Sequence, residues 1–260
     1  MRLGKHAVQH DPRTLRYAAY AASVPTPPDT VNWYSDAGTW RPLGNLQLGN
    51  CTATMVAHQV QAMTSADLGT PALVPYRGVM RFYSATSGYV PGRPATDQGA
   101  TMLSVMNRWR HVGMAGHKIN AYAAIDVADL LHIRQAVWLF GGAPIGLQLP
   151  LSLKALVLSG GTTWDVQGPV TGDNAAGSWG GHAVPILGYV PDGSGGFNYF
   201  APSWNGLYTI TTAFMAAYCD EAYAAFSQRD WSRAGYAPNG FNTAALLADV
   251  AAILQTANAA

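Results

Sequence analysis

Apolar residues in the first half of the chain recur at the spacing of helices. One predicted helix covers residues 51–63, with Asn50 before it as a suitable N-cap. A second covers about residues 98–112. A third starts at the acidic residues 126–129, runs through Trp138 and ends at the two glycines 141 and 142. The side chains expected to face inward from the first two helices are Met55, Val56, Val60, Met63, Met102, Val105, Met106 and Trp109.

The pattern differs between and after these helices. Residues 66–98 are rich in Gly, Pro and Ser and predict a loop with short elements. Residues 118–124 predict a strand, and further short apolar runs separated by turn residues predict strands at 143–149, 182–189, 197–201 and 207–210. Residues 191–196 have the composition of a hairpin turn. A helix capped by Thr211 or Thr212 is expected through about Phe226, and a final helix over roughly 242–257.

This order of elements predicts an α+β fold. We expect one domain over residues 36–260, made of a helical lobe (36–142), an antiparallel β lobe (143–210) and C-terminal helices (211–260).

The segment before the domain, residues 1–35, is called the arm below. Pro25, Pro27 and Pro28 make part of it stiff and extended. Trp33 and Trp40 are expected to attach the arm to the domain by burial. Because the arm is short for an inhibitory segment, we expect it to pack on the domain surface and leave the functional site open.

Composition narrows the classes of function. Of 260 residues, 49% are hydrophobic and only 11% charged, which excludes a disordered chain. The net charge of +1 and the scattered Lys and Arg argue against a nucleic-acid partner or an anionic membrane surface. Two cysteines exclude a disulfide scaffold and a cysteine-rich zinc site, so we expect no metal and no cofactor. We find neither a signal peptide nor an apolar stretch long enough to span a membrane, and expect synthesis in the cytoplasm.

Cys51 is the candidate nucleophile. A thiol at the first turn of a helix has its pKa lowered by the helix N-terminus, and a neighbouring histidine lowers it further. The alternative is that Cys51 is a small buried apolar residue. Cys219 lies inside the helix predicted from residue 212, so it is expected to be packed and inert.

The candidate base is His182. Its polar side chain follows two glycines and opens an apolar strand, so it can face a cleft while the strand is buried. His58 lies seven residues after Cys51 on the same helix, roughly 10 Å further along the axis, and is expected to have a packing role. The remaining histidines have no catalytic context: His6, His10, His111, His117 and His132.

These residues occur in segments that resemble papain-like cysteine peptidases. Leu48-Gly49-Asn50-Cys51-Thr52-Ala53 is similar to the nucleophile segment of that family, and residues 182–189 are similar to its histidine strand. Residues 143–149 resemble the strand that opens the β lobe, and Ser203-Trp204 resembles part of an Asn-Ser-Trp-Gly motif. Residues 214–223 resemble a late motif of divergent bacterial and phage members. The resemblance implies a helical lobe followed by a β lobe, with an active-site cleft between them.

The chain departs from the family pattern at two functional positions. The glutamine that completes the oxyanion hole aligns with Asn45, while Gln47 lies two residues closer to Cys51. Either side chain could supply the amide donor, and the alignment favours Asn45. The asparagine that orients the histidine aligns with Pro202, which has no side-chain acceptor. The orienting role then falls to another group, with Asn198 and Asn205 the nearest candidates in sequence, or the site is a Cys–His dyad.

The resemblance implies a thiol hydrolase that cleaves a peptide or amide bond with Cys51, His182 and Asn45. Its substrate would be a peptide or protein, cell-wall peptide included, and acyl transfer is open to the same residues. Folding should bring Cys51 and His182 together across 131 residues, lower the pKa of the thiol and raise that of the imidazole. The alternative is a non-catalytic structural or binding module of the same fold, such as a component of an oligomer or a phage particle.

Overall fold

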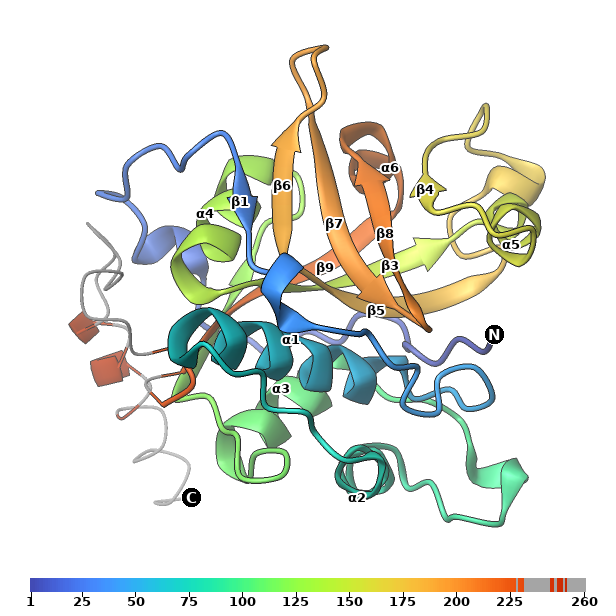
Figure 1. Ribbon diagram of the computed structural model, residues 1–260, viewed down its shortest axis with the longest axis horizontal. Coiled ribbons are helices and arrows are strands. Elements are labelled where there is room, and N and C mark those ends of the chain that lie inside the picture. The colour runs from blue at the N-terminus through green and yellow to red at the C-terminus, as the bar shows by residue number, and fades with distance from the viewer. Residues whose placement is uncertain (228, 232–243, 246, 250, 252–260) are drawn as a thin grey trace.

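The computed structural model describes residues 1–227, 229–231, 244–245, 247–249 and 251. A helical layer lies on one side of the molecule, and two β-sheets with their own helices lie on the other (Figure 1). The helical layer contains α1 (Cys51–Leu68), α2 (Tyr76–Ser87) and α3 (Met102–His111). Each side has its own cluster of buried apolar side chains. The predicted α+β fold, with a helical part and a β part, is confirmed.

Helix α1 is the centre of the helical layer, and all its residues from Cys51 to Ser65 are buried. The predicted apolar face is buried, and so are the polar side chains on the other faces. Some of these polar side chains bond to backbone carbonyls, as where Gln61 donates to Ala37 O at 2.7 Å, whereas the side chains of Thr52, Thr54 and Gln59 have no hydrogen-bond partner among the described residues. Asn50 is at the N-cap position but donates to Leu43 O at 2.9 Å and makes no side-chain cap.

The other predicted helices have their expected faces and ends. All four predicted inward side chains of α3 are fully buried. Helix α4 (Leu130–Phe140) begins at Asp129, whose side chain accepts from His132 N at 3.0 Å. It ends at Gly141, whose φ of 70° suits a residue without a side chain.

The nine strands in the described part of the chain form two sheets. One has the order β1 (Val31–Asn32), β6 (Gly188–Pro191), β7 (Phe197–Ser203), β8 (Gly206–Thr211) and β4 (Thr163–Trp164), with only β4 and β8 parallel. The other has the antiparallel order β2 (Ala121–Ile125), β9 (Cys219–Phe226), β3 (Ala143–Leu149) and β5 (Gly180–Ile186). Only Leu187 separates β5 from β6, so the chain passes there from one sheet to the other. The strands predicted at 118–124, 143–149, 197–201 and 207–210 and the hairpin at residues 191–196 are confirmed. The single strand predicted over 182–189 is divided at Leu187 into β5 and β6.

The helix predicted from residue 212 through Phe226 is wrong in its second half. Helix α6 (Thr212–Tyr218) ends after seven residues, and Cys219–Phe226 is strand β9. This strand pairs with β2 on one side and β3 on the other, and most of its residues are buried. A strand in the middle of a sheet is buried on both faces and lacks the alternation of polar and apolar residues that marks an edge strand. The alanines of β9 also have a high helix propensity, so its sequence favours a helix. The final helix predicted over 242–257 falls mostly outside the described residues.

Three further features were not predicted. Helix α2 lies within the segment predicted as loop, because Pro75 and Gly88 mark its two ends and do not indicate a loop. Helix α5 (Leu151–Leu158) lies inside the predicted β lobe. Strand β2 belongs to the same sheet as β3 and β5, although it precedes them in the predicted helical segment. Short 3-10 helices occur at Tyr17–Ala19, Ser35–Ala37, Pro94–Thr96 and Gly172–Asn174.

The second part of the arm packs on the domain as predicted. Tyr17, Tyr20 and Val31 are buried in the core of the β part, and strand β1 pairs with β6. Trp33 Nε1 donates to Val137 O at 2.8 Å, and Trp40 is buried.

His58 makes folding stability depend on pH. Its Nε2 lies 2.9 Å from Arg41 O, and burial lowers its pKa from 6.5 to about 4. Stability is therefore full above pH 6.5 and falls towards pH 4, because the unfolded state binds a proton that the folded state excludes. His58→Gln should reduce the loss of unfolding free energy between pH 7 and 4 by about 3 kcal/mol. Urea denaturation across this pH range measures it, and an unchanged pH dependence would contradict it.

Candidate active site

Cys51 is the first residue of α1 and is 1% exposed. Burial raises the pKa of its thiol to about 11, and this outweighs the opposing effects of the Ala183, Gly4 and Thr52 backbone N–H groups and of the Lys5 charge. The lowered pKa expected from the sequence is therefore wrong for this conformation. The helix N-terminus is present, but burial removes the thiol from solvent and this disfavours the charged thiolate.

His182 lies on β5 and is fully buried. Its Nε2 is 2.7 Å from Ser203 Oγ, and its ring stacks on Trp204 with ring centres 4.7 Å apart. Its Nδ1 has no hydrogen-bond partner among the described residues. Burial lowers the pKa of His182 to about 3, so the expected rise is also wrong here and the imidazole is neutral.

Ser203 is the group that holds the histidine. The sequence comparison named Asn198 and Asn205 as candidates, and neither is the partner of His182. Ser203 ends β7, and Trp204 follows it with φ of 47°, a conformation uncommon for a residue with a side chain. The expectation that some acceptor lies at the second imidazole nitrogen is met by a serine hydroxyl. The sequence marks Ser203-Trp204 as part of a family motif, but it does not indicate that the serine hydroxyl takes the orienting role.

Helix α1 packs against β5, and this brings Cys51 to the backbone of the histidine strand. The backbone N–H of Ala183, the residue directly after His182, lies at the Cys51 thiol and lowers its pKa. One imidazole nitrogen is held by Ser203 and the other is unpartnered. The site thus combines a thiol at a helix N-terminus with a neutral histidine that Ser203 orients. The histidine directly precedes Ala183, whose backbone N–H lies at the thiol.

Of the two candidate amide donors, Asn45 faces the interior and Gln47 is exposed. The Nδ2 of Asn45 donates to Arg2 O at 3.2 Å and to Leu48 O at 3.1 Å. One N–H of this amide therefore already binds a peptide carbonyl that comes from the arm.

The first residues of the arm cross this site, and the expectation that the arm leaves it open is wrong. In Figure 1 they run between the helical layer and the sheets. Gly4 O accepts from Ala100 N at 2.8 Å, His6 N donates to Ala100 O at 3.0 Å, and Lys5 N donates to Gly181 O at 3.0 Å. The Gly4 N–H lies at the Cys51 thiol. A short segment is enough to cover the site because it binds through its backbone, like an added strand.

Glycines make this close approach of backbones feasible. A Cβ on Gly4 would overlap the carbonyl of Gly49, and a Cβ on Gly99 would overlap the carbonyl of Gly4. A Cβ on Gly181 would overlap the carbonyl of Lys5. Nothing in the spacing of these glycines along the sequence shows that they face one another.

Other reactive groups lie elsewhere. The prediction that Cys219 lies inside a helix is wrong, because Cys219 begins strand β9. Burial raises the pKa of its thiol to about 12. In the described part of the chain, no three His, Cys, Asp or Glu side chains are grouped to hold a metal ion.

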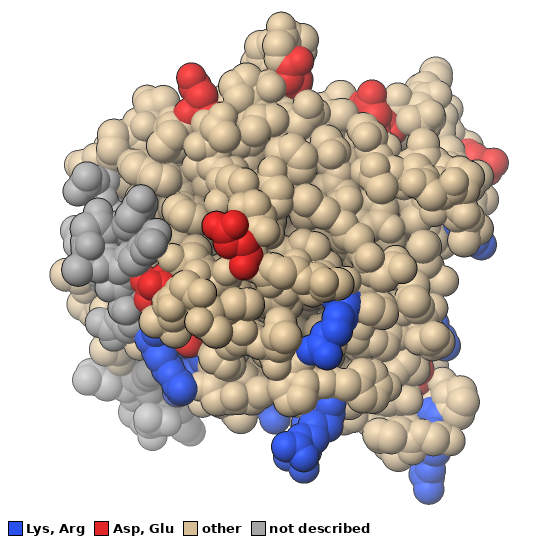
Figure 2. Space-filling view, in the orientation of Figure 1, with Lys and Arg blue, Asp and Glu red and all other residues tan. Residues whose placement is uncertain are grey.

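No described helix has the length and apolar character needed to cross a membrane. On the face in Figure 2, charged side chains are scattered singly among uncharged ones.

No family model matches the sequence, and no curated protein matches it. Solved structures of similar shape are cysteine proteases. Xylellain, a cysteine protease from Xylella fastidiosa, has a TM-score of 0.63 at 15% identity, covering 86% of this chain and 96% of its own. Procathepsin L 3 of Tenebrio molitor has a TM-score of 0.58 at 16% identity, covering 84% and 75%. A Carica candamarcensis cysteine protease in complex with E-64 has a TM-score of 0.54 at 12% identity, covering 77% and 99%. The chain has the fold of the papain-like cysteine proteases.

Proposed function

We propose that this protein is a cysteine peptidase or amide hydrolase, and that the conformation described here is its closed state. The observation that carries the proposal is the state of His182. One of its nitrogens bonds to Ser203, its ring stacks on Trp204, and its Nδ1 is buried and unpartnered. The next residue, Ala183, has its backbone N–H at the Cys51 thiol. A packing histidine satisfies both nitrogens, whereas a general base keeps one free for the proton that it takes.

The arm must leave before the reaction starts. Water then reaches Cys51, the desolvation that raises its pKa is relieved, and the helix N-terminus stabilises the thiolate. His182 Nδ1 takes the thiol proton, and the sulfur attacks the carbonyl carbon of the substrate. The Cys51 backbone N–H and Asn45 Nδ2 donate to the oxyanion. His182 gives its proton to the leaving amine, and a water molecule hydrolyses the thioester and frees the thiol.

The substrate class follows from how the arm binds. An extended peptide can bond to Ala100 and Gly181 through its own backbone, as residues 4–6 do now. We therefore expect a peptide or protein substrate, with cell-wall peptides included in this class. A non-catalytic binding module is the second candidate, and the occupied site with its protonated thiol favours it in the present conformation.

Gly4→Val separates the two candidates, because the larger side chain cannot fit against Gly49 and should displace the arm. The full-length variant is incubated with a peptide mixture and quenched in acid. We expect cleaved peptides and a thioester on Cys51, both seen by mass spectrometry. A variant whose Cys51 reacts with iodoacetamide but yields neither product would support the binding module.

A further inference from the structure

Lys5 is the most deeply placed residue of the arm. Its side chain is fully buried, and its Nζ lies 2.8 Å from Asp220 Oδ2 and 3.7 Å from Glu221 Oε2. Nζ also donates to His6 O at 3.2 Å. A lysine is rarely this buried unless its charge is matched, and here two adjacent carboxylates of β9 match it.

Strand β3 leaves space for the long side chain of Lys5 at Gly146. A Cβ on Gly146, in the middle of β3, would overlap the aliphatic part of Lys5. Glycine weakens a strand interior, and this close approach gives a physical reason for it there. Gln148, two residues on, donates to Asp220 Oδ2 at 2.6 Å and orients that carboxylate.

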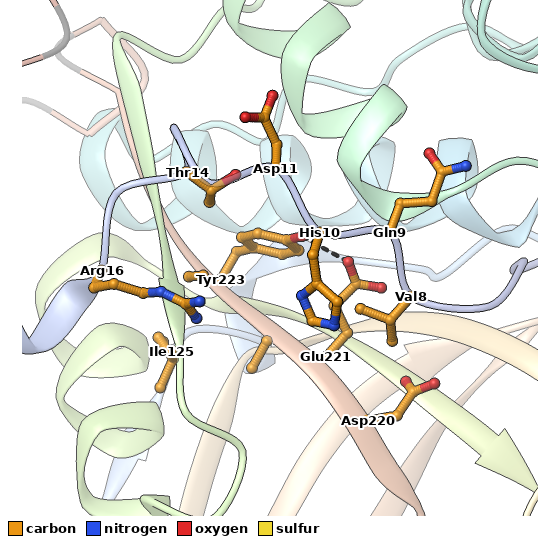
Figure 3. A pocket seen from close by; sticks show the side chains of 12 residues that line it. Val8, Gln9, His10, Asp11, Thr14, Arg16, Ile125, Asp220, Glu221 and Tyr223 are labelled. Carbon is orange, nitrogen blue, oxygen red and sulfur yellow. Dashed lines mark hydrogen bonds between the residues drawn. The ribbon is translucent and has the colours of Figure 1, made fainter. Parts of the chain in front are cut away.

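The two carboxylates are set to receive a cation. Tyr223 donates to Glu221 Oε1 at 2.6 Å, shown by the dashed line in Figure 3. Glu221 is 5% exposed and its Oε2, which faces Lys5, has no hydrogen-bond partner among the described residues. Asp220 Oδ1 is likewise buried without one. His10 of the arm lies beside Glu221 (Figure 3). Both side chains line a pocket of about 70 Å³.

This acidic subsite (Gly146, Gln148, Asp220 and Glu221) lies next to the nucleophile. The backbone of its occupant bonds to Gly181, the residue before His182, and the preceding residue of the arm lies at the Cys51 thiol. A peptide that replaces the arm along the same backbone partners would place one side chain in this subsite. If that side chain carried no positive charge, the bound peptide would cover the carboxylates of Asp220 and Glu221 without a counter-charge. Burying unpaired charges in this way is strongly unfavourable.

We propose that the acidic subsite selects substrates with a lysine side chain close to the scissile bond, and that Lys5 of the arm occupies it as a substitute. The substrate class rests on the proposed function, whereas the binding of lysine can be measured without catalysis.

Protection of Cys51 from alkylation tests the binding. Full-length Gly4→Val is treated with iodoacetamide in the presence of acetyl-Leu-Gly-Lys-His-Ala-Val-amide, or of the same peptide with norleucine in place of lysine. We expect the lysine peptide to slow alkylation at least about tenfold more than the norleucine peptide, a typical effect for pairing a buried charge. Equal protection by the two peptides would overturn the proposal.

Variants of the subsite show where the discrimination arises. The double variant Asp220→Asn/Glu221→Gln should abolish the difference in protection between the two peptides. Gly146→Ala should weaken the binding of the lysine peptide, because the added methyl group takes the space of the lysine side chain. Asp173→Asn is the matched control, because Asp173 is exposed and outside the subsite. Far-ultraviolet circular dichroism and melting temperature establish that each variant is folded. A lysine preference that survives in both subsite variants would also overturn the proposal.

Cleavage assays keep the two proposals apart. Substrate pairs that differ only by lysine or norleucine should differ in kcat/KM at least about tenfold in Gly4→Val. Cleavage without this preference would reject the acidic subsite and leave the peptidase standing. Selective protection by the lysine peptide without any cleavage would reject the peptidase and leave the subsite standing.

Discussion

Gly4→Val should raise the rate at which iodoacetamide alkylates Cys51 at pH 8 by at least about 100-fold, since a shift of that size follows from modest destabilisation of the closed state. In the parent protein Cys51 is 1% exposed and burial raises its pKa to about 11, so few molecules offer a thiolate to the reagent. The branched side chain at position 4 would overlap backbone atoms of Gly49, which cannot move aside as a flexible side chain does. The arm should therefore leave the site while residues 17–33 stay packed.

The matched control is Ala7→Val, which adds comparable bulk to an exposed position of the same arm. It should alkylate at the rate of the parent protein. The labelled residue is identified by mass spectrometry after proteolysis, so that reaction at Cys219 is counted separately. If Cys51 in the parent protein already reacts as fast as in Gly4→Val, the arm does not protect the thiol and the closed state is wrong.

Cys51→Ser in the Gly4→Val background should abolish peptide hydrolysis, a loss of at least about 1,000-fold, as expected on removing a nucleophile. A serine hydroxyl at this position has no comparable acidity, so transfer of its proton to His182 is far less favourable. Cys219→Ser should leave the rate within about threefold, because that thiol starts β9 and its Sγ donates to Glu221 O at 3.7 Å. Rates are measured on the peptide that Gly4→Val cleaves. Hydrolysis retained in Cys51→Ser would refute the proposed nucleophile.

The sequence predicts those helices that have capping residues at their ends or apolar side chains on a single face. Helix α4 was predicted because Asp129 caps one end and Gly141 closes the other. Helix α3 was predicted because its apolar side chains share one face. Strand β9 was missed because a strand buried between two others has no alternation, and α2 was missed because prolines and glycines at helix ends also occur in loops.

The candidate site was predicted only as far as single segments could indicate it. Cys51 and His182 stand in recognisable segments, but the partner of His182 depends on how β7 ends beside β5. A serine hydroxyl next to Trp204 fills that position, and its neighbour in sequence is the proline that the alignment singled out. The position of Gly4 and Lys5 against Gly49, Ala100 and Asp220 is set by contacts across 45 to 215 residues, which periodicity cannot report.

The attachment of residues 17–33 to the core turns residues 2–6 into a tethered ligand. Short flexible tethers commonly give an effective concentration in the millimolar range, so even a weak intramolecular contact keeps a site occupied. The connecting residues 7–14 are largely exposed. A single cut within them would leave the fold intact and make the ligand a free peptide, subject to dilution. At micromolar protein, a fragment that binds with a millimolar dissociation constant would leave, and the opening of the site would be irreversible.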